Sequence, residues 1–173
     1  MGLPITTVED FKGGRYKVPL NQITLKDFTP YIEDNENRAL NYLLGVELAG
    51  LFLADLDANT NLPTIQRFTY IYDYFFDSEE CCKEKSESLG IKKYLQGLIW
   101  FDYIRFNNTQ NGMVGGQSNI SENSEPAPLK KTRAVKLYND SIGTLKAIQN
   151  YICENSDTYP EYEGTNREFL TII

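Results

Sequence analysis

The sequence predicts a mainly α fold, a helical bundle with a long loop or short β-hairpin between the last two long helices and with extended termini. Two segments carry this prediction, residues 90–106 and 132–153, because their apolar residues recur at steps of three and four. The stretch between them, 107–124, is polar and rich in glycine, which is typical of a loop or a hairpin.

The chain of 173 residues is long enough to bury one core, so a single domain is expected. We place the helical bundle domain at 27–155, between an extended N-terminal arm, 1–26, and a C-terminal tail, 156–173. The tail ends in apolar residues, which need cover from the chain's own core or from another copy.

The composition narrows the class of function. The chain contains no histidine, which excludes His-based catalytic triads, His metal sites and His pH switches. Its net charge of −7 argues against a surface that grips nucleic acid, because phosphate binding needs clustered lysine and arginine. Aromatic residues make up 13% of the chain, a high share that fits either a dense core or protein–protein contacts.

Three cysteines leave an odd thiol in any pairing, and the first residues lack the pattern of a signal peptide. A reducing cytosol is therefore the expected site of synthesis. Cys81 and Cys82 are adjacent, but they form no CxxC motif and have no further ligands nearby for zinc, so we interpret them as incidental. No apolar run is long enough to span a membrane.

The N-terminal arm contains Pro4, Pro19, Gly13 and Gly14 among short apolar pieces, so no helix of useful length fits. Two alternatives stay open for it. The arm either grips a neighbouring subunit or folds back over its own core.

The first helix is predicted to begin at Thr29 and Pro30, because threonine caps helices and proline suits the first helical position. It continues to Gly45, which marks a stop or a kink. A second helical piece is expected over 48–56, weakened by Gly50.

Residues 55–61 place oxygen side chains at alternate positions, as the first part of an EF-hand loop does. Thr60 stands where the turn glycine belongs, and Gln66 where the bidentate glutamate belongs. We therefore predict a polar turn and not a calcium site.

The next two segments are harder to interpret. Residues 64–76 have apolar side chains near helical spacing, and we predict a helix, although their many Thr, Tyr, Ile and Phe residues also suit a strand. Residues 77–88 are charged and poor in apolar residues, so a surface loop or an exposed helical turn is expected.

The glycine-rich stretch contains a hairpin-type turn signal at Asn111-Gly112, with Thr109-Gln110 and Met113-Val114 as the two sides of a short ribbon. It does not match a phosphate-binding P-loop, because no Gly-Lys-Ser/Thr follows and the stretch leaves a helix instead of a strand.

Several of these features together resemble one protein family. The aromatic-rich helix after Gly90, the loop NTQNGMVG, and the sequence SENSEPAP before an amphipathic helix with Tyr138 resemble head-to-tail connector (adaptor, head completion) proteins of tailed bacteriophages, in particular those of crAss-like phages. The likeness covers about residues 89–153. The polar insertion at 77–88 and the C-terminal tail depart from it.

The resemblance implies a virion structural protein that forms a ring beneath the portal and links the capsid to the tail around the DNA channel. It implies a homo-oligomer, typically a dodecamer, with the portal protein and a tail or second adaptor protein as partners. DNA then passes through without specific binding, and assembly takes place in the host cytoplasm. No membrane partner, cofactor, metal or catalytic residue is expected.

Inter-subunit or portal contacts are expected in the glycine-rich loop and in the C-terminal tail. The residues are Thr109, Asn111, Gly112, Met113 and Val114 in the loop, and Phe169, Leu170 and Ile172 in the tail.

Two other classes of function stand beside the connector. One is a non-virion helical protein-interaction module, such as a small inhibitor or accessory protein. The other is an enzyme, for which Asp102 and Arg105 in the aromatic helix are the charges to consider. We interpret these two as an ion pair at i, i+3 that satisfies both groups.

Overall fold

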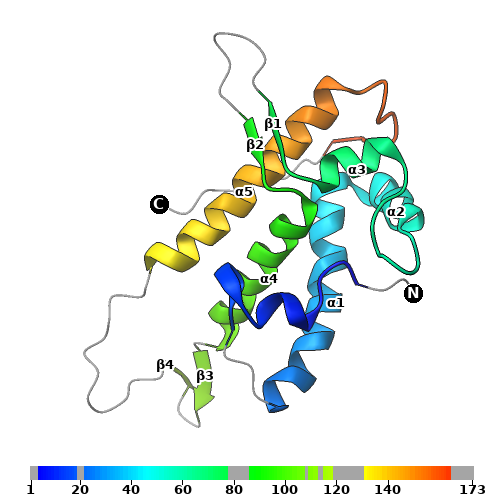
Figure 1. Ribbon diagram of the computed structural model, residues 1–173. Helices are drawn as coiled ribbons and strands as arrows, with labels where there is room; N and C mark the ends of the chain where they lie inside the picture. The colour runs from blue at the N-terminus through cyan, green and yellow to red at the C-terminus, as the bar shows by residue number, and fades with distance from the viewer. Residues whose placement is uncertain are drawn as a thin grey trace.

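The computed structural model is mainly α-helical, and it describes residues 4–18, 22–77, 86–107, 109–112, 115–118 and 131–164. The helices and strands form a helical bundle with short β-hairpins (Figure 1). The helices are α1 (Gln22–Leu44), α2 (Val46–Asp55), α3 (Gln66–Tyr72), α4 (Ile91–Asn107) and α5 (Lys131–Glu154), and two short 3-10 helices, η1 (Val8–Phe11) and η2 (Gly14–Tyr16), precede them. The strands are β1 (Phe75–Asp77), β2 (Ser86–Ser88), β3 (Thr109–Gly112) and β4 (Gly115–Ser118).

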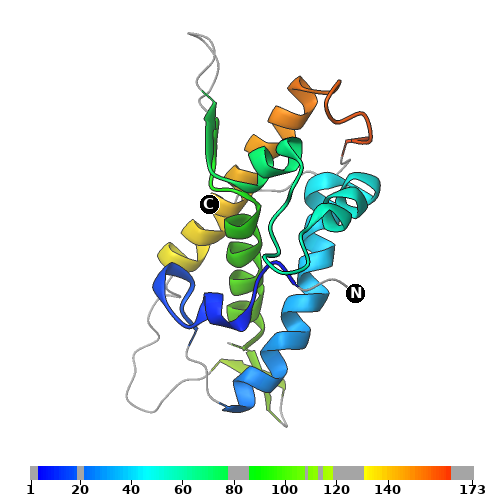
Figure 2. The same ribbon diagram turned by 45° about the vertical axis from the view of Figure 1, so that its right-hand side comes forward.

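Helix α4 lies at the centre of the bundle. It packs between α5 on one side and α1 on the other, as Figures 1 and 2 both show. Its residues Ile91, Tyr94, Leu95 and Ile99 are fully buried, at the helical spacing that the sequence predicts. The α4 and α5 helices therefore confirm the two segments on which the predicted fold class depends.

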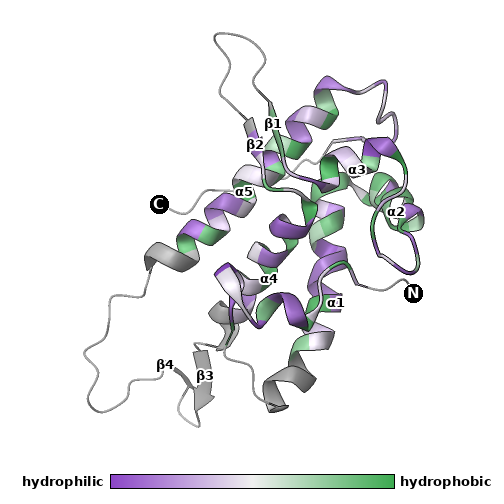
Figure 3. Ribbon diagram, in the orientation of Figure 1, coloured by the Kyte–Doolittle hydropathy of each residue, from purple (hydrophilic) through white to green (hydrophobic). Residues whose placement is uncertain are grey.

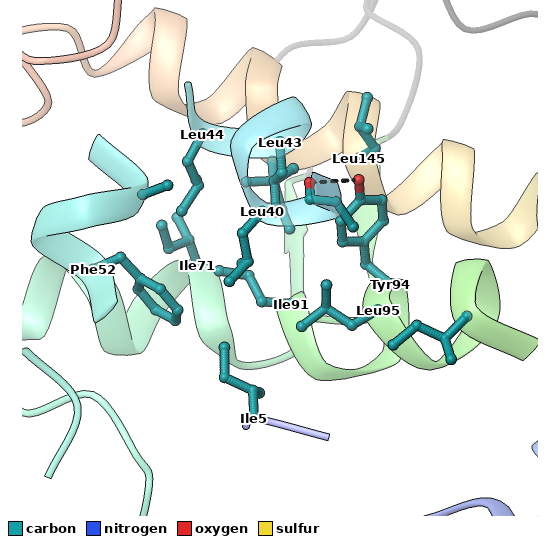
Figure 4. Packing of buried hydrophobic residues seen from close by; sticks show 14 of the residues in the cluster. Ile5, Leu40, Leu43, Leu44, Phe52, Ile71, Ile91, Tyr94, Leu95 and Leu145 are labelled. Atoms are coloured by element: carbon teal, nitrogen blue, oxygen red, sulfur yellow. Dashed lines mark hydrogen bonds between the residues drawn. The ribbon is translucent and has the colours of Figure 1, made fainter. Parts of the chain in front are cut away.

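The core is built from side chains of several elements that meet around Tyr94 (Figure 4). Leucines of α1 and α5 surround this ring, and its hydroxyl donates a hydrogen bond of 3.0 Å to the carbonyl oxygen of Ala39. A buried tyrosine hydroxyl needs such a partner, because an unpaired polar group in a core is costly. Ile5 reaches the same cluster from the N-terminal segment.

The N-terminal segment, residues 4–18, folds back over the bundle. Its side chains Ile5, Phe11, Tyr16 and Val18 are buried in the same core as the long helices. These residues therefore cover the chain's own core, which is the second of the two alternatives that the sequence leaves open. The 3-10 helices η1 and η2 supply the tight turns of this path.

Helix α1 begins at Gln22, so the prediction of a start at Thr29 and Pro30 is wrong. Pro30 lies inside the helix. A proline there removes one helical hydrogen bond. The burial of Phe28 offsets this cost, since its ring is fully buried and packs edge-on against Phe11 and Tyr103 at centroid distances of 4.9 and 4.7 Å.

The predicted break at Gly45 is confirmed. This residue separates α1 from α2 and has a φ of 76°, a left-handed value that favours glycine. The polar turn predicted after α2 is also present. The Asp57 carboxylate accepts hydrogen bonds from the backbone N–H groups of Asn59 and Thr60, as aspartate does in tight turns.

The helix predicted over 64–76 is shorter than expected, because α3 ends at Tyr72 and Phe75–Asp77 form strand β1. The prediction of a loop or helical turn across 77–88 is wrong for residues 86–88, which form strand β2. The two strands pair antiparallel, and Phe75 is buried whereas Phe76 is exposed, the alternation of a strand. Contact of β2 with α5 gives the hairpin a tertiary partner that the local sequence does not reveal.

A hairpin also stands between α4 and α5, as predicted, but its turn is displaced. Asn111 and Gly112 are paired with Gly116 and Gly115 in the ladder, so they do not form the turn. The strands are joined by residues 113–114, which lie outside the described residues. This position allows four cross-strand pairs, from Thr109↔Ser118 to Gly112↔Gly115, whereas a turn at Asn111-Gly112 would leave room for fewer.

Candidate interaction surface

The large apolar side chains that are exposed in the described part of the chain all come from one stretch, between α2 and β1. These elements occupy the upper part of the molecule in Figures 1 and 2. We call this set the α2–β1 surface; its members are Val46, Leu51, Leu53, Leu62, Ile65, Tyr70, Tyr74 and Phe76.

Helix α2 contributes Val46, Leu51 and Leu53 to the surface, because its sequence, VELAGLFLAD, is apolar on nearly all sides. One face, formed by Leu48, Ala49 and Phe52, is buried against the bundle. The outer side still carries apolar residues, and Val46 is 78% exposed. Figure 3 shows this helix as one of the most hydrophobic parts of the ribbon although it lies at the periphery. A peripheral helix of this kind normally has a partner on its outer face.

Aromatic contacts hold α2 against α3. The ring of Phe52 packs edge-on against Phe68, with centroids 5.6 Å apart, and lies over Tyr72 at 6.4 Å. The C-terminal end of α2 is tied to the start of α3 by Asp55, whose carboxylate accepts hydrogen bonds of 2.9 Å from the N–H groups of Thr64 and Ile65. The apolar side chains of this surface are thus presented by a fixed framework.

The aromatic end of the surface is fixed in a similar way. Tyr70 is 42% exposed and stacks on Phe75 and Tyr151, with ring centroids 5.1 and 4.5 Å away. Tyr74 and Phe76 follow in the chain, with 59% and 47% of their surface exposed. Rigid aromatic rings of this kind are common anchors in protein–protein contacts.

The stretch that carries the surface is acidic. Its carboxylates are Glu47, Asp55, Asp57, Asp73 and Asp77, and its one basic residue is Arg67. The guanidinium group of Arg67 is bound to both carboxylate oxygens of Glu161, at 2.9 and 3.2 Å, so its charge is already neutralised. A stretch that combines exposed apolar side chains with a negative net charge favours a partner that is apolar and not acidic.

Hydrogen bonds keep two of these carboxylates charged. Partial burial raises the pKa of Asp55, but the hydrogen bonds from Thr64 and Ile65 outweigh that effect and hold the pKa below its ordinary value. Hydrogen bonds from Thr60 and Asn59 lower the pKa of Asp57 in the same way. The negative character of the stretch therefore persists well into the acidic range.

The contact residues predicted from the sequence lie elsewhere. Thr109, Asn111 and Gly112 are in β3, beyond the C-terminal end of α4, whereas α3 meets α4 at its N-terminal end. Met113, Val114, Phe169, Leu170 and Ile172 lie outside the described residues. The α2–β1 surface was not predicted from the sequence, although the apolar pattern on all sides of 46–56 was a usable signal.

Of the two charges expected to pair in α4, Asp102 and Arg105, only the Asp102 side chain lies among the described residues. Asp102 forms an ion pair with Arg38 of α1, with the nitrogen and oxygen 3.0 Å apart. The side chain of Arg105 lies outside the described part of the structure. Asp102 thus links two helices of the bundle.

Glu36 is the buried carboxylate of the bundle, and it holds the N-terminal segment. Its oxygens accept hydrogen bonds of 2.7 and 2.9 Å from the backbone N–H groups of Ile5 and Thr6, and one of 2.6 Å from the Thr6 hydroxyl. Burial raises the pKa of Glu36 above its ordinary value, although these hydrogen bonds oppose the rise. The Glu36 side chain therefore stabilises the position of the N-terminal segment on the bundle.

Neither a metal site nor a membrane-spanning helix is found among the described residues. The described residues contain no group of three or more Cys, Asp and Glu side chains placed to hold a metal ion. Cys153 is exposed on α5, while Cys81 and Cys82 lie outside the described residues. Within the same part of the chain, no helix combines the length and the hydropathy needed to cross a membrane.

Comparison of the chain with protein-family models, with curated proteins and with solved structures found no match.

Proposed function

We propose that the protein is a structural subunit that acts by binding other protein subunits, and that it is a head-to-tail connector of a tailed bacteriophage virion. The α2–β1 surface is the observation that carries this proposal. It supplies exposed large apolar side chains of the kind that protein–protein interfaces bury at their centre.

Covering the exposed side chains of the α2–β1 surface favours association. Fully burying a valine, leucine, isoleucine or phenylalanine side chain stabilises a protein by about 1.5–3 kcal/mol relative to leaving it exposed. Val46, Ile65 and Phe76 each expose about half of their surface or more. A partner that covers them gains part of this free energy, so association is favoured.

The polar groups of the core support a structural role. Besides Glu36, the buried hydroxyls of Ser141 and Thr144 donate hydrogen bonds to carbonyl oxygens one turn earlier in α5, at 3.0 and 2.9 Å. The buried amide side chain of Gln96 accepts a hydrogen bond from Lys93. Each of these hydrogen bonds satisfies a buried polar group within its own helix, α5 or α4, as the packing of a core requires.

The assignment to connectors rests on the resemblance of the segment 89–153. The mainly helical fold agrees with that family, and the net charge of −7 suits a channel wall along which DNA slides without binding. In this proposal the copies form a ring, which docks on the portal protein and receives a tail or second adaptor protein. The protein is then located in the virion after assembly in the host cytoplasm.

The proposal is tested by the state of assembly of the purified chain, measured by mass photometry and electron microscopy with and without a portal ring. The expected result is a closed ring of fixed copy number, formed alone or on the portal. A chain that stays monomeric and does not bind the portal ring contradicts the proposal. If a pull-down recovers one soluble enzyme in place of portal and tail proteins, the protein is an interaction module instead.

A further inference from the structure

We infer that the α2–β1 surface of one copy receives residues 165–173 of a neighbouring copy. This inference rests on the proposed function, because it takes assembly as given and names the two parts of the chain that meet. Its support is the position of the last described residues, the chemistry of the segment that follows them, and the charge of the surface.

The chain before residue 165 is anchored at the edge of the α2–β1 surface. The Tyr159 hydroxyl donates a hydrogen bond of 2.7 Å to the carbonyl oxygen of Arg67, at the start of α3. The guanidinium group of Arg67 in turn binds the carbonyl oxygen of Thr158, at 2.9 Å, and the carboxylate of Glu161. Residues 158–161 are thus fixed beside α3, which contributes Tyr70 to the surface.

Residues 165–173 have the sequence TNREFLTII. Phe169, Leu170, Ile172 and Ile173 are strongly apolar, and the charges of the two ionic residues cancel. Nine extended residues reach at most about 30 Å. The segment therefore combines apolar side chains with no net side-chain charge, the chemistry that suits the surface.

Charge argues against the same surface of a second copy as the occupant. Two copies of the stretch 46–77, meeting face to face, would bring their carboxylates together, and Arg67 is already neutralised by Glu161. Like charges across an interface oppose association. The side chains of 165–173 carry no net charge, and Arg167 supplies a cation for carboxylates such as the exposed Glu47.

A contact between this segment and the surface of the next copy is heterologous, because each copy gives one part and receives the other. Contacts of this type generate closed rings when the rotation between copies closes. Docking of the segment on the surface of its own copy would satisfy the same chemistry without joining subunits. The experiment separates these two arrangements.

The test mixes two variants of the chain, each of which lacks one side of the contact. One chain ends at Gly164 and keeps the surface. The other is full length and carries Val46→Asp and Ile65→Ser, which damage the surface. If the segment docks on a neighbouring copy, each chain alone is monomeric by mass photometry, and the mixture forms a one-to-one complex that grows no further.

The surface variant is designed to fold. Val46 is the first residue of α2, where an aspartate interacts favourably with the helix dipole. Ile65 is the N-cap of α3 and makes no capping side-chain hydrogen bond, so serine suits that position. Asn37→Asp, at an exposed site of α1, is the matched control that adds one negative charge elsewhere. Helical circular dichroism checks the fold of every variant.

The control is expected to assemble as the unmodified chain does, and the surface variant to associate at least tenfold more weakly. If the chain that ends at Gly164 forms rings as well as the full chain, the segment is not the occupant, although the proposed function stands. If the two halves stay monomeric in the mixture while the full chain assembles, the inference is also wrong. A full chain that is monomeric and ignores the portal ring contradicts the proposed function itself.

Discussion

The buried carboxylate of Glu36 accepts hydrogen bonds from both the backbone N–H and the hydroxyl of Thr6, with distances of 2.9 and 2.6 Å. The two residues lie 30 positions apart, so this contact closes the N-terminal segment over the bundle. Phe11, Tyr16 and Val18 follow in the same segment and are buried. The contact thus positions a large part of the core.

Glu36→Gln is expected to lower the free energy of unfolding by about 1–3 kcal/mol, the cost typical of leaving a buried hydrogen-bond donor without an acceptor. The amide keeps the size of the side chain but presents an N–H₂ group to donors. Urea unfolding followed by circular dichroism measures the change. Glu33→Gln, at an exposed position of the same helix, is the control and should change stability little. Equal effects of the two substitutions would show that the Thr6 contact contributes nothing particular.

The cost of Glu36→Gln should also depend on pH. Burial raises the pKa of Glu36 in the folded state, with a smaller contribution from the Asp10 carboxylate. A folded pKa above the unfolded value gives stability that is complete below the unfolded pKa and is lost as the pH rises through the folded pKa. The difference in unfolding free energy between the unmodified protein and the variant should therefore be larger at pH 4 than at pH 7. A difference that grows with pH would mean that the pKa is lowered instead.

Gly97 and Gly143 should respond to alanine in opposite directions. A Cβ atom at Gly97 would lie 1.9 Å from the Ser141 hydroxyl oxygen, at the contact between α4 and α5. Gly97→Ala is therefore expected to destabilise by about 1–3 kcal/mol through overpacking. A Cβ at Gly143 meets nothing within 4 Å, so Gly143→Ala should stabilise α5 by about 0.5–1 kcal/mol. Thermal unfolding of both variants measures the signs, and a stabilising Gly97→Ala would contradict this packing.

The long helices could be predicted from the sequence because the residues that each helix buries recur at regular steps along that one helix. Apolar side chains of α4 and α5 recur at helical spacing, and that pattern reports which face is buried. Features that depend on distant residues were missed. Pro30 is tolerated inside α1 because Phe28 packs on Phe11 and Tyr103, and β2 forms beside α5, neither of which is visible in the local sequence.

The candidate surface could have been predicted in part. The apolar residues of α2 occur on nearly every side of the helix, so some of them must be exposed or covered by a partner. Which ones are exposed depends on the orientation of α2, which is set by the packing of Phe52 on Phe68 and Tyr72. The acidic surroundings are readable from the sequence, but the neutralisation of Arg67 by Glu161 is not, because these residues are 94 positions apart.

Tyr159→Phe is expected to destabilise the protein by about 1 kcal/mol, because the carbonyl oxygen of Arg67 loses a hydrogen-bond donor at a buried ring. Limited proteolysis should in addition cut the chain after α5 more readily, since the hydroxyl helps to hold residues 158–161 against α3. Tyr74→Phe is the matched control, because the Tyr74 ring is 59% exposed. An unchanged proteolysis pattern in Tyr159→Phe would show that the Arg67 contacts alone hold this segment.

Ile65→Ser should change stability and association in opposite directions. Ile65 occupies the N-cap of α3 without a capping side-chain hydrogen bond, so a serine hydroxyl there is expected to stabilise the helix by about 1 kcal/mol. The same change removes an apolar side chain that is 50% exposed in the α2–β1 surface, so association should weaken. Ile65→Ala removes the side chain without adding a cap, and it should weaken association equally while giving no gain in stability. Urea unfolding and mass photometry of the two variants separate these effects, and unchanged association in both would exclude Ile65 from the interface.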